Sequence, residues 1–168
     1  KQRRKKYVWD VPAVDYFNEN YERVEIANNV MAPCYLSKNR SNPEKDFEAM
    51  LARSSKVSWW YKNGESEPKY FALLYKGADG KDHGFYPDFI FELKDGRIGI
   101  FDTKEGRTAE DAKPKAEALA AFIKKENQRR KPQVLFGGIV VFKDGSCRYN
   151  ESASYAYDKT NLGADWKY

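Results

Sequence analysis

The chain has 168 residues, and its 30 Lys and Arg residues outnumber its 25 Asp and Glu residues by five. This length suits one domain, and a composition that is 41% hydrophobic predicts a folded core and excludes a disordered chain. No apolar run approaches the roughly 18 residues of a membrane-spanning helix, and one histidine with two cysteines cannot form a Cys/His zinc site.

The excess positive charge lies at the N-terminus. Residues 1–6 hold five basic groups and no acid, so residues 7–168 contain 30 − 5 = 25 basic residues against 25 acidic ones. We therefore expect a basic leader or linker over 1–6 and a single domain over 7–168, with its core at about 43–143. The abrupt basic start without an initiator Met indicates a fragment of a larger multidomain protein. We expect a cytoplasmic protein with free thiols at its two cysteines.

The first clear helix is expected to begin near Asn42. The mixed segment before it, residues 7–36, predicts one or two strands with a loop. Asn42 suits the N-cap, Pro43 suits the first helical position, and the acid at Glu44 favours the positive end of the helix dipole. After the helix closes at residues 52–55, a β-branched and aromatic run predicts a strand.

The rest of the chain predicts strands and one long helix. Asp-Gly pairs at 79–80, 95–96 and 144–145 are strong hairpin signals, because both turn positions favour positive φ. The predicted elements are strand-like runs at 69–76, 84–93, 97–104 and 133–142, with a helix from about 109 to 130 between the last two. This order indicates an α/β fold with a central mixed β-sheet flanked by helices.

Three residues in the middle of the chain are expected to converge. Asp102 and Lys104 are two positions apart on a predicted strand, so they project from the face that also carries Ile98 and Ile100. Asp88 begins the preceding strand, and in an antiparallel pair the start of one strand lies beside the end of the next. The sequence therefore predicts two carboxylates and an ammonium at one edge of the sheet.

Such a cluster suits a hard divalent cation. Neighbouring carboxylates repel unless they are neutralised, and Mg²⁺ binds through one or two carboxylates while it accepts phosphate oxygens. Lys104 can then orient water and stabilise charge that develops on a phosphate. A third acid from the first helix would complete the site, with Glu44 as the first choice and Glu48, one turn later, as the second.

These residues resemble a known signature. Pro87-Asp88 followed by Asp102-Thr103-Lys104 is similar to the PD-(D/E)XK nuclease motif. The positions around Glu44, Trp59, Lys62-Asn63 and Tyr86–Phe89 resemble, more narrowly, the C-terminal endonuclease domain of type III restriction enzyme subunits. The resemblance covers about residues 44–142.

The resemblance implies a restriction-endonuclease-like αβββαβ core that cleaves double-stranded DNA. Asp88, Asp102 and Glu44 would be the ligands of Mg²⁺ or Mn²⁺, Lys104 would be the catalytic lysine, and Lys115 would at most support them. The implied partners are an N-terminal helicase-type motor in the same polypeptide, which alone would use ATP, and a modification subunit; no membrane partner is expected.

The chain departs from the family pattern at two positions. Many relatives carry Glu where Asp102 stands, and many place Gly directly after the catalytic lysine, whereas Glu105 precedes Gly106 here. Two other interpretations therefore remain. One is a catalytically inactive nucleic-acid-binding or assembly module with the same fold, and the other is an unrelated enzyme or partner-binding α/β domain.

Overall fold

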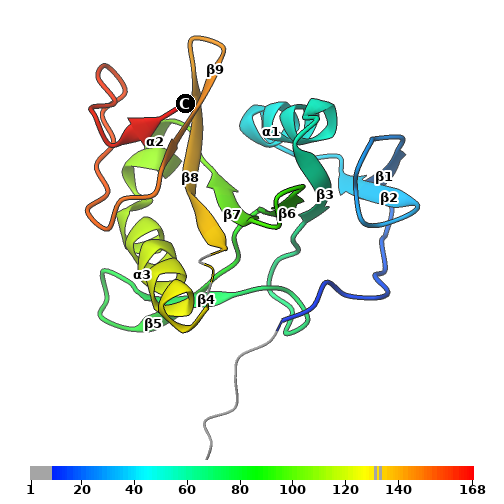
Figure 1. Ribbon diagram of the computed structural model, residues 1–168, viewed down its shortest axis with the longest axis horizontal. Coiled ribbons are helices and arrows are strands. Elements are labelled where there is room, and N and C mark those ends of the chain that lie inside the picture. Colours follow the sequence, from blue (N-terminus) through cyan, green and yellow to red (C-terminus); the bar gives the residue numbers. More distant parts are fainter. Residues whose placement is uncertain (1–8, 131, 133) are drawn as a thin grey trace, which may run out of the picture.

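The computed structural model describes residues 9–130, 132 and 134–168. The expected basic leader, residues 1–6, lies outside the described residues. Figure 1 shows the arrangement, and the elements follow one another in this order: β1 (Tyr21–Val24), β2 (Cys34–Ser37), α1 (Asn42–Arg53), β3 (Val57–Lys62), β4 (Leu73–Lys76), β5 (Asp82–Phe85), β6 (Phe89–Leu93), β7 (Ile98–Thr103), α2 (Gly106–Glu110), α3 (Lys113–Arg129), β8 (Leu135–Lys143), β9 (Ser146–Asn150) and β10 (Trp166–Lys167).

A mixed six-stranded sheet forms the centre of the fold. Its strands lie in the order β10-β9-β8-β7-β6-β3. Strands β7 and β8 are parallel, whereas the other neighbouring pairs are antiparallel. Two short hairpins, β1-β2 and β4-β5, form separate two-stranded sheets. The predicted central mixed sheet with flanking helices is confirmed.

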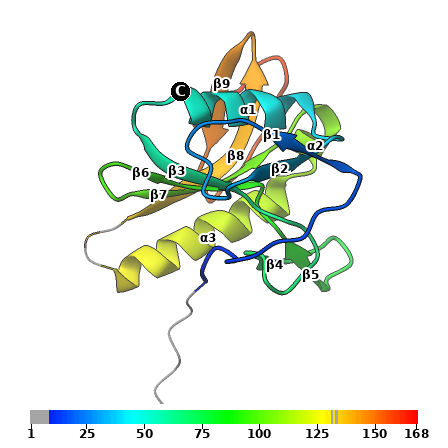
Figure 2. The ribbon, with the colours of Figure 1, turned by 90° about the vertical axis from the view of Figure 1, so that its right-hand side faces the viewer.

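The two faces of the sheet carry separate cores. Helix α1 covers one face and α3 covers the other (Figure 2). Because successive side chains of a strand point to opposite faces, Phe101 joins the cluster under α1 together with Phe47, whereas Ile100 joins the cluster under α3 together with Leu119. The Phe47 and Phe89 rings meet edge to face with centroids 5.0 Å apart. The end of β7 is therefore fixed from both sides.

Helix α1 begins one residue earlier than the sequence prediction. Ser41, not Asn42, is the N-cap, and Glu44 completes a capping box. The Glu44 Oε2 atom accepts hydrogen bonds from the Ser41 amide (2.8 Å) and hydroxyl (2.7 Å). The reason is that the capping box requires Glu or Gln three residues after the N-cap: Glu44 stands there for Ser41, whereas Lys45 stands there for Asn42.

The three Asp-Gly turns join strands as predicted, but they differ in conformation. Both turn residues have positive φ only at Asp144-Gly145, between β8 and β9. At the other two turns only Gly80 and Gly96 have positive φ. Those connections are longer than two residues, and longer hairpin loops need a left-handed residue only at their last position.

Two predicted elements are each divided in the structure. The run 84–93 separates into β5 and β6, because Pro87 has no amide hydrogen to continue a strand ladder. The predicted helix 109–130 becomes α2 and α3, and Pro114 falls in the first turn of α3, where a proline is tolerated. Strand β4 begins at Leu73, later than the start expected at residue 69.

The C-terminal segment after β9 packs against the start of the α2-α3 layer. The buried Tyr155 hydroxyl donates a hydrogen bond of 2.7 Å to the Ala109 carbonyl oxygen. Trp166, in β10, packs on Tyr155 with ring centroids 5.7 Å apart. Both cysteines, Cys34 and Cys147, are free thiols, as predicted.

Candidate active site

A pocket of about 450 Å³ lies where the start of α1 faces the end of β7. It brings together three of the predicted site residues, Glu44, Asp88 and Lys104, and the predicted supporting residue Lys115. Asp102 does not line the pocket; its residue is 2% exposed. The full lining is Ser41, Glu44, Glu65, Asp88, Thr103, Lys104, Glu105, Thr108, Asp111, Ala112 and Lys115.

Asp88 is held in place by the neighbouring strand. Its Oδ2 atom accepts hydrogen bonds from the Thr103 amide (2.9 Å) and hydroxyl (2.8 Å), while Oδ1 accepts one from Lys62 Nζ (3.0 Å). Burial alone would raise the pKa of Asp88. The positive charges of Lys62 and Lys104 and the Thr103 hydrogen bonds outweigh burial and hold that pKa at about 2. Asp88 is therefore ionised at neutral pH.

Asp102 lies on the face predicted from the two-residue period. It shares the α3 side of β7 with Ile98 and Ile100, and Lys104 Nζ forms an ion pair with its Oδ2 atom. The antiparallel pairing of Phe89 with Phe101 brings Asp88 to the adjacent strand end. Burial first, and then the negative charge of Asp88, raise the pKa of Asp102 to about 7.

Glu44 faces the pocket, whereas Glu48 does not. The second carboxylate oxygen of Glu44, Oε1, pairs with Lys62 Nζ at 2.9 Å. Burial would raise the pKa of Glu44, but Lys62 and Ser41 lower it overall. Glu48 is buried beside Arg40, whose Nε lies 3.0 Å from Oε2, and burial raises the pKa of Glu48. Of the two acids considered, Glu44 is the one beside Asp88.

Lys62 is a site residue to which the sequence assigns no role. Its ammonium lies between Glu44 Oε1 (2.9 Å) and Asp88 Oδ1 (3.0 Å), and it stands over the Phe89 ring, 4.7 Å from the centroid. Although burial lowers the pKa of Lys62, Asp88 and Glu44 raise it overall. The pairing of β3 with β6, which places Lys62 opposite Phe89, is the signal that would have identified it.

Asn63 fixes the segment that presents Asp88. Its side-chain Nδ2 donates to the carbonyl oxygens of Phe71 (2.8 Å) and Pro87 (2.9 Å), and its Oδ1 accepts from the Phe71 amide (3.1 Å). Its backbone amide donates to the Asp88 carbonyl oxygen at 2.8 Å. Asn63 is 5% exposed, so water cannot replace these bonds.

We expect Asn63→Ala to lower the free energy of unfolding by about 3 kcal/mol, because it removes three buried side-chain hydrogen bonds that are each worth about 1 kcal/mol. We also expect the pKa of Asp88, followed by carboxyl NMR titration, to rise toward its ordinary value. Asn127→Ala is the matched control, since Asn127 also makes three side-chain hydrogen bonds, but to Val134 and Leu135. An unchanged Asp88 titration in Asn63→Ala would contradict this role.

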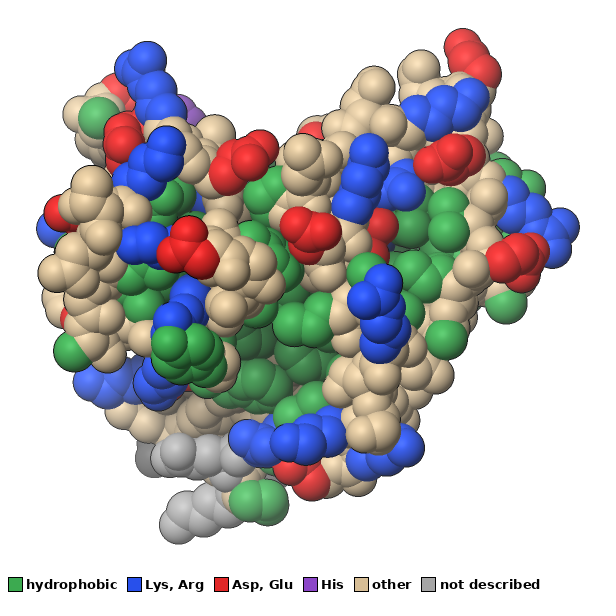
Figure 3. All heavy atoms as spheres, turned by 90° about the horizontal axis from the view of Figure 1, so that it is seen from above, with side chains coloured by type: hydrophobic (Ala, Val, Ile, Leu, Met, Phe, Trp, Pro, Cys, Tyr) green, Lys and Arg blue, Asp and Glu red, His purple; other side chains and the backbone are tan. Residues whose placement is uncertain are grey.

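The pocket lining is acidic. Glu44, Glu65, Asp88, Glu105 and Asp111 give five negative charges, against two positive charges from lysines at 104 and 115, for a net of −3. Seen from above, acidic and basic side chains border a hollow in the surface (Figure 3). An acidic pocket of this kind attracts cations and, without one, repels phosphate.

The carboxylates do not form a ready metal cage. Among the described residues, no group of three His, Cys, Asp or Glu side chains is placed to hold a metal ion. Glu44 and Asp88 share the Lys62 ammonium, and Asp102 pairs with Lys104. Carboxylate oxygens are the donors that Mg²⁺ prefers, and the Lys62 ammonium stands in for a cation between two of them. The donor atoms are therefore of the kind that suits a hard divalent cation, whereas their present arrangement pairs each carboxylate with a lysine ammonium.

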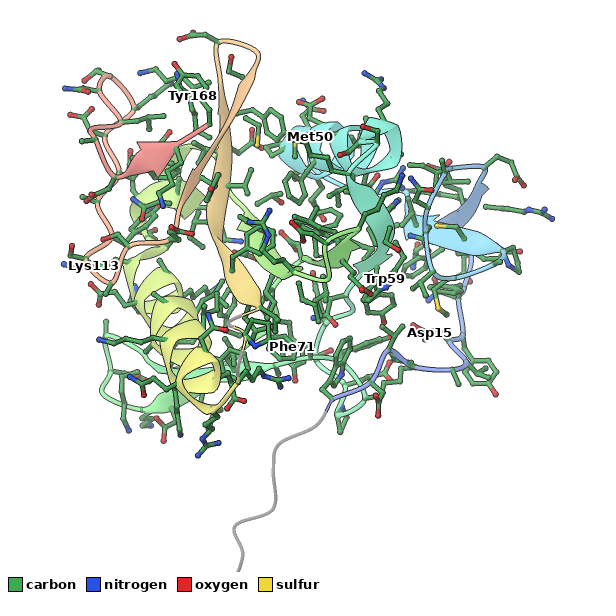
Figure 4. The ribbon with its side chains drawn as sticks, in the orientation of Figure 1. Asp15, Met50, Trp59, Phe71, Lys113 and Tyr168 are labelled. Atoms are coloured by element: carbon green, nitrogen blue, oxygen red, sulfur yellow. The ribbon has the colours of Figure 1, made fainter. Side chains whose placement is uncertain are left out.

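A second pocket, of about 560 Å³, adjoins the first on the side of β1 and β2. Both pockets are lined by Glu44 and Glu65, and Lys62 lines the second. Its outer wall includes Asp15 (Figure 4), whose Oδ1 accepts hydrogen bonds from Lys69 Nζ (2.7 Å) and the Tyr70 hydroxyl (3.0 Å). Lys62 thus lines the second pocket, next to Glu44, which borders both pockets.

In the part of the chain that the structure describes, no helix is long and apolar enough to cross a membrane.

Comparison with known proteins places the chain in a family. No curated protein and no solved structure matches the chain. The model of the YagJ family matches residues 34–139, which include β3, β6, β7 and every predicted site residue. The chain therefore belongs to the YagJ family.

Proposed function

We propose that this chain is a metal-dependent endonuclease domain that hydrolyses phosphodiester bonds of double-stranded DNA. The observation that carries the proposal is the meeting of Glu44, Asp88 and Lys104 in one pocket, with Asp102 buried directly beside them. When the separate β4-β5 hairpin and the short helix α2 are left out, α1, β3, β6, β7, α3 and β8 follow one another in the order αβββαβ expected of a restriction-endonuclease-like core, which supports the same proposal.

Each site residue has a distinct part in this proposal. Glu44, Asp88 and Asp102 hold Mg²⁺, or Mn²⁺ in its place. When bound, the cation supplies charge neutralisation for phosphate and lowers the pKa of bound water. Thr103 fixes the Asp88 carboxylate through two hydrogen bonds, so that it keeps one orientation. The Lys104 ammonium lines the pocket and stabilises negative charge on the phosphate during attack.

The proposal extends to the partners of the domain. We infer a place at the C-terminus of a type III restriction enzyme subunit, after a helicase-type motor that uses ATP and beside a modification subunit, in the cytoplasm. The near-neutral body of the chain supports delivery by another module, because residues 7–168 carry 25 basic and 25 acidic groups and no net charge to attract DNA.

One observation favours the alternative, a catalytically inactive nucleic-acid-binding or assembly module. The Lys62 ammonium already forms ion pairs with both Glu44 and Asp88, so each carboxylate has a positively charged partner without a metal. In that case the buried charges would have a structural role only.

Cleavage of supercoiled plasmid in Mn²⁺ tests the proposal. We expect Asp88→Asn to slow cleavage by about a hundredfold, which is typical for the loss of a charge-stabilising group. Asp46→Asn, an exposed acid of the same α1 helix as Glu44, should leave the rate unchanged. Since a missing motor could silence the wild type, Mn²⁺ binding is measured in parallel by calorimetry. A wild-type chain that neither cleaves DNA nor binds Mn²⁺ would support the inactive module instead.

A further inference from the structure

We propose that Lys62 is an internal counter-cation that competes with the divalent cation for the position between Glu44 and Asp88. Metal would bind there only when the Lys62 ammonium moves away from the two carboxylates that it contacts. This inference rests on the proposed metal-dependent function and deepens it, because it assigns a control element to the same site.

The contacts of Lys62 carry the inference. Its Nζ atom makes nearly equal contacts with the two carboxylates, at 2.9 Å to Glu44 Oε1 and 3.0 Å to Asp88 Oδ1. The other oxygens are already committed, since Glu44 Oε2 caps α1 and Asp88 Oδ2 accepts from Thr103. Lys62 therefore contacts the one oxygen of Glu44 and the one oxygen of Asp88 that these hydrogen bonds leave for a metal.

The Lys62 side chain borders a pocket into which it can move. Its side chain is 17% exposed and lines the larger pocket, whereas Glu44 lines both pockets. Glu65, which also lines both pockets, offers the Lys62 ammonium an alternative negatively charged partner there. A lysine is suited to such a shift, because its ammonium is a point charge on a flexible four-carbon stem.

The charge balance gives the reason for a resident cation. Without Lys62, Glu44 and Asp88 would be two neighbouring, largely buried anions without a shared partner, which is destabilising. The ammonium thus holds the site together until a cation of higher charge arrives. Lys115, which lines the same pocket but has no ion pair with Glu44 or Asp88 among the contacts described, does not have this function.

Calorimetric titration of the 168-residue chain with MnCl₂ tests the inference. We expect Lys62→Met to bind Mn²⁺ roughly tenfold more tightly than the wild type, or better, a change of about 1.4 kcal/mol in binding free energy. Lys115→Met, which removes one positive charge from the pocket that Glu44 and Asp88 line, is the matched control and should change the affinity much less. In EDTA we expect a lower melting temperature for Lys62→Met than for the wild type, with recovery on addition of Mn²⁺.

A second variant tests the inference in the opposite direction if Lys62→Met does not fold. Arg at this position presents a fork that pairs with carboxylates more firmly than an ammonium does, so Lys62→Arg should weaken Mn²⁺ binding. Equal affinity of Lys62→Met and wild type, with binding abolished by Asp88→Asn, would overturn the competition while leaving the proposed metal site intact. Absence of Mn²⁺ binding in all variants would overturn both the competition and the metal-dependent function.

Discussion

Asp102→Asn is expected to stabilise the protein, by up to about 4 kcal/mol near pH 8. Asn has almost the same volume as Asp but no charge to bury. Burial and the nearby Asp88 raise the pKa of Asp102 to about 7, from a usual value of 3.8. Each tenfold change in proton affinity corresponds to about 1.4 kcal/mol, so ionising this carboxyl inside the fold is costly. An acid at position 102 would then be explained by its function in the site and not by the stability of the fold.

The sign of the pH dependence follows from linkage. A carboxyl whose pKa is raised on folding contributes stability below pH 3.8, and that contribution is lost as the pH rises through about 7. Asp88 behaves in the opposite way: with a folded pKa of about 2, it contributes stability above 3.8 that is lost as the pH falls. The Asp102 effect is therefore best measured above pH 5, where Asp88 is constant.

Urea unfolding of wild type and Asp102→Asn near pH 5 and pH 8 provides the measurement. We expect the advantage of the variant to grow by about 2–3 kcal/mol over this interval. Asp95→Asn is the control, because Asp95 is exposed, pairs with Arg97 and has a lowered pKa, so its effect should not change with pH here. A constant difference for Asp102→Asn, or a loss of stability near pH 8, would contradict the burial argument.

Gly138→Ala is expected to destabilise the fold by about 3 kcal/mol, at the upper end of the usual cost of overpacking. A Cβ atom at position 138 would overlap the backbone carbonyl of Asn150 in β9. Backbone cannot swing aside as the end of a side chain can, so β8 would have to shift. Strand β8 also pairs with β7 at Asp102 and Thr103, and the shift would reach the candidate site.

Gly84→Ala is the matched control for this effect. Gly84 also lies in a strand, but a Cβ there meets only the Tyr86 ring, at 3.3 Å. A flexible side chain can move by a few tenths of an ångström, so we expect a change below about 1 kcal/mol. Equal urea midpoints for the two alanine variants would show that β8 tolerates a side chain at 138, contrary to the close backbone contact.

Short-range rules recovered much of the fold. The period of two placed Asp102 on the same face as Ile100, and helix-end chemistry located α1 to within one residue. Asp-Gly pairs identified three hairpin turns. These features succeed because they depend on residues only a few positions apart, where steric rules and hydrogen-bond geometry decide the outcome.

Features that depend on the pairing of strands far apart in the sequence were missed. Nothing local to residues 57–62 shows that β3 pairs with β6 rather than with another strand, and this pairing brings Lys62 to Asp88.

The capping role of Ser41 was assigned to Asn42, since both residue types favour that position. The acidity of the pocket also depends on Glu65 and Asp111, which lie on segments whose spatial proximity has no sequence signature.

The two oxygens of Glu44 connect helix folding to site chemistry. One oxygen closes the capping box with Ser41, and the other contacts Lys62. A single carboxylate cannot reorient toward a ligand without changing its bond to the helix end, so ligand occupancy and fraying of the first turn of α1 form one coupled equilibrium. Amide hydrogen exchange in that turn would therefore report events in the pocket, even though those amides are not part of it.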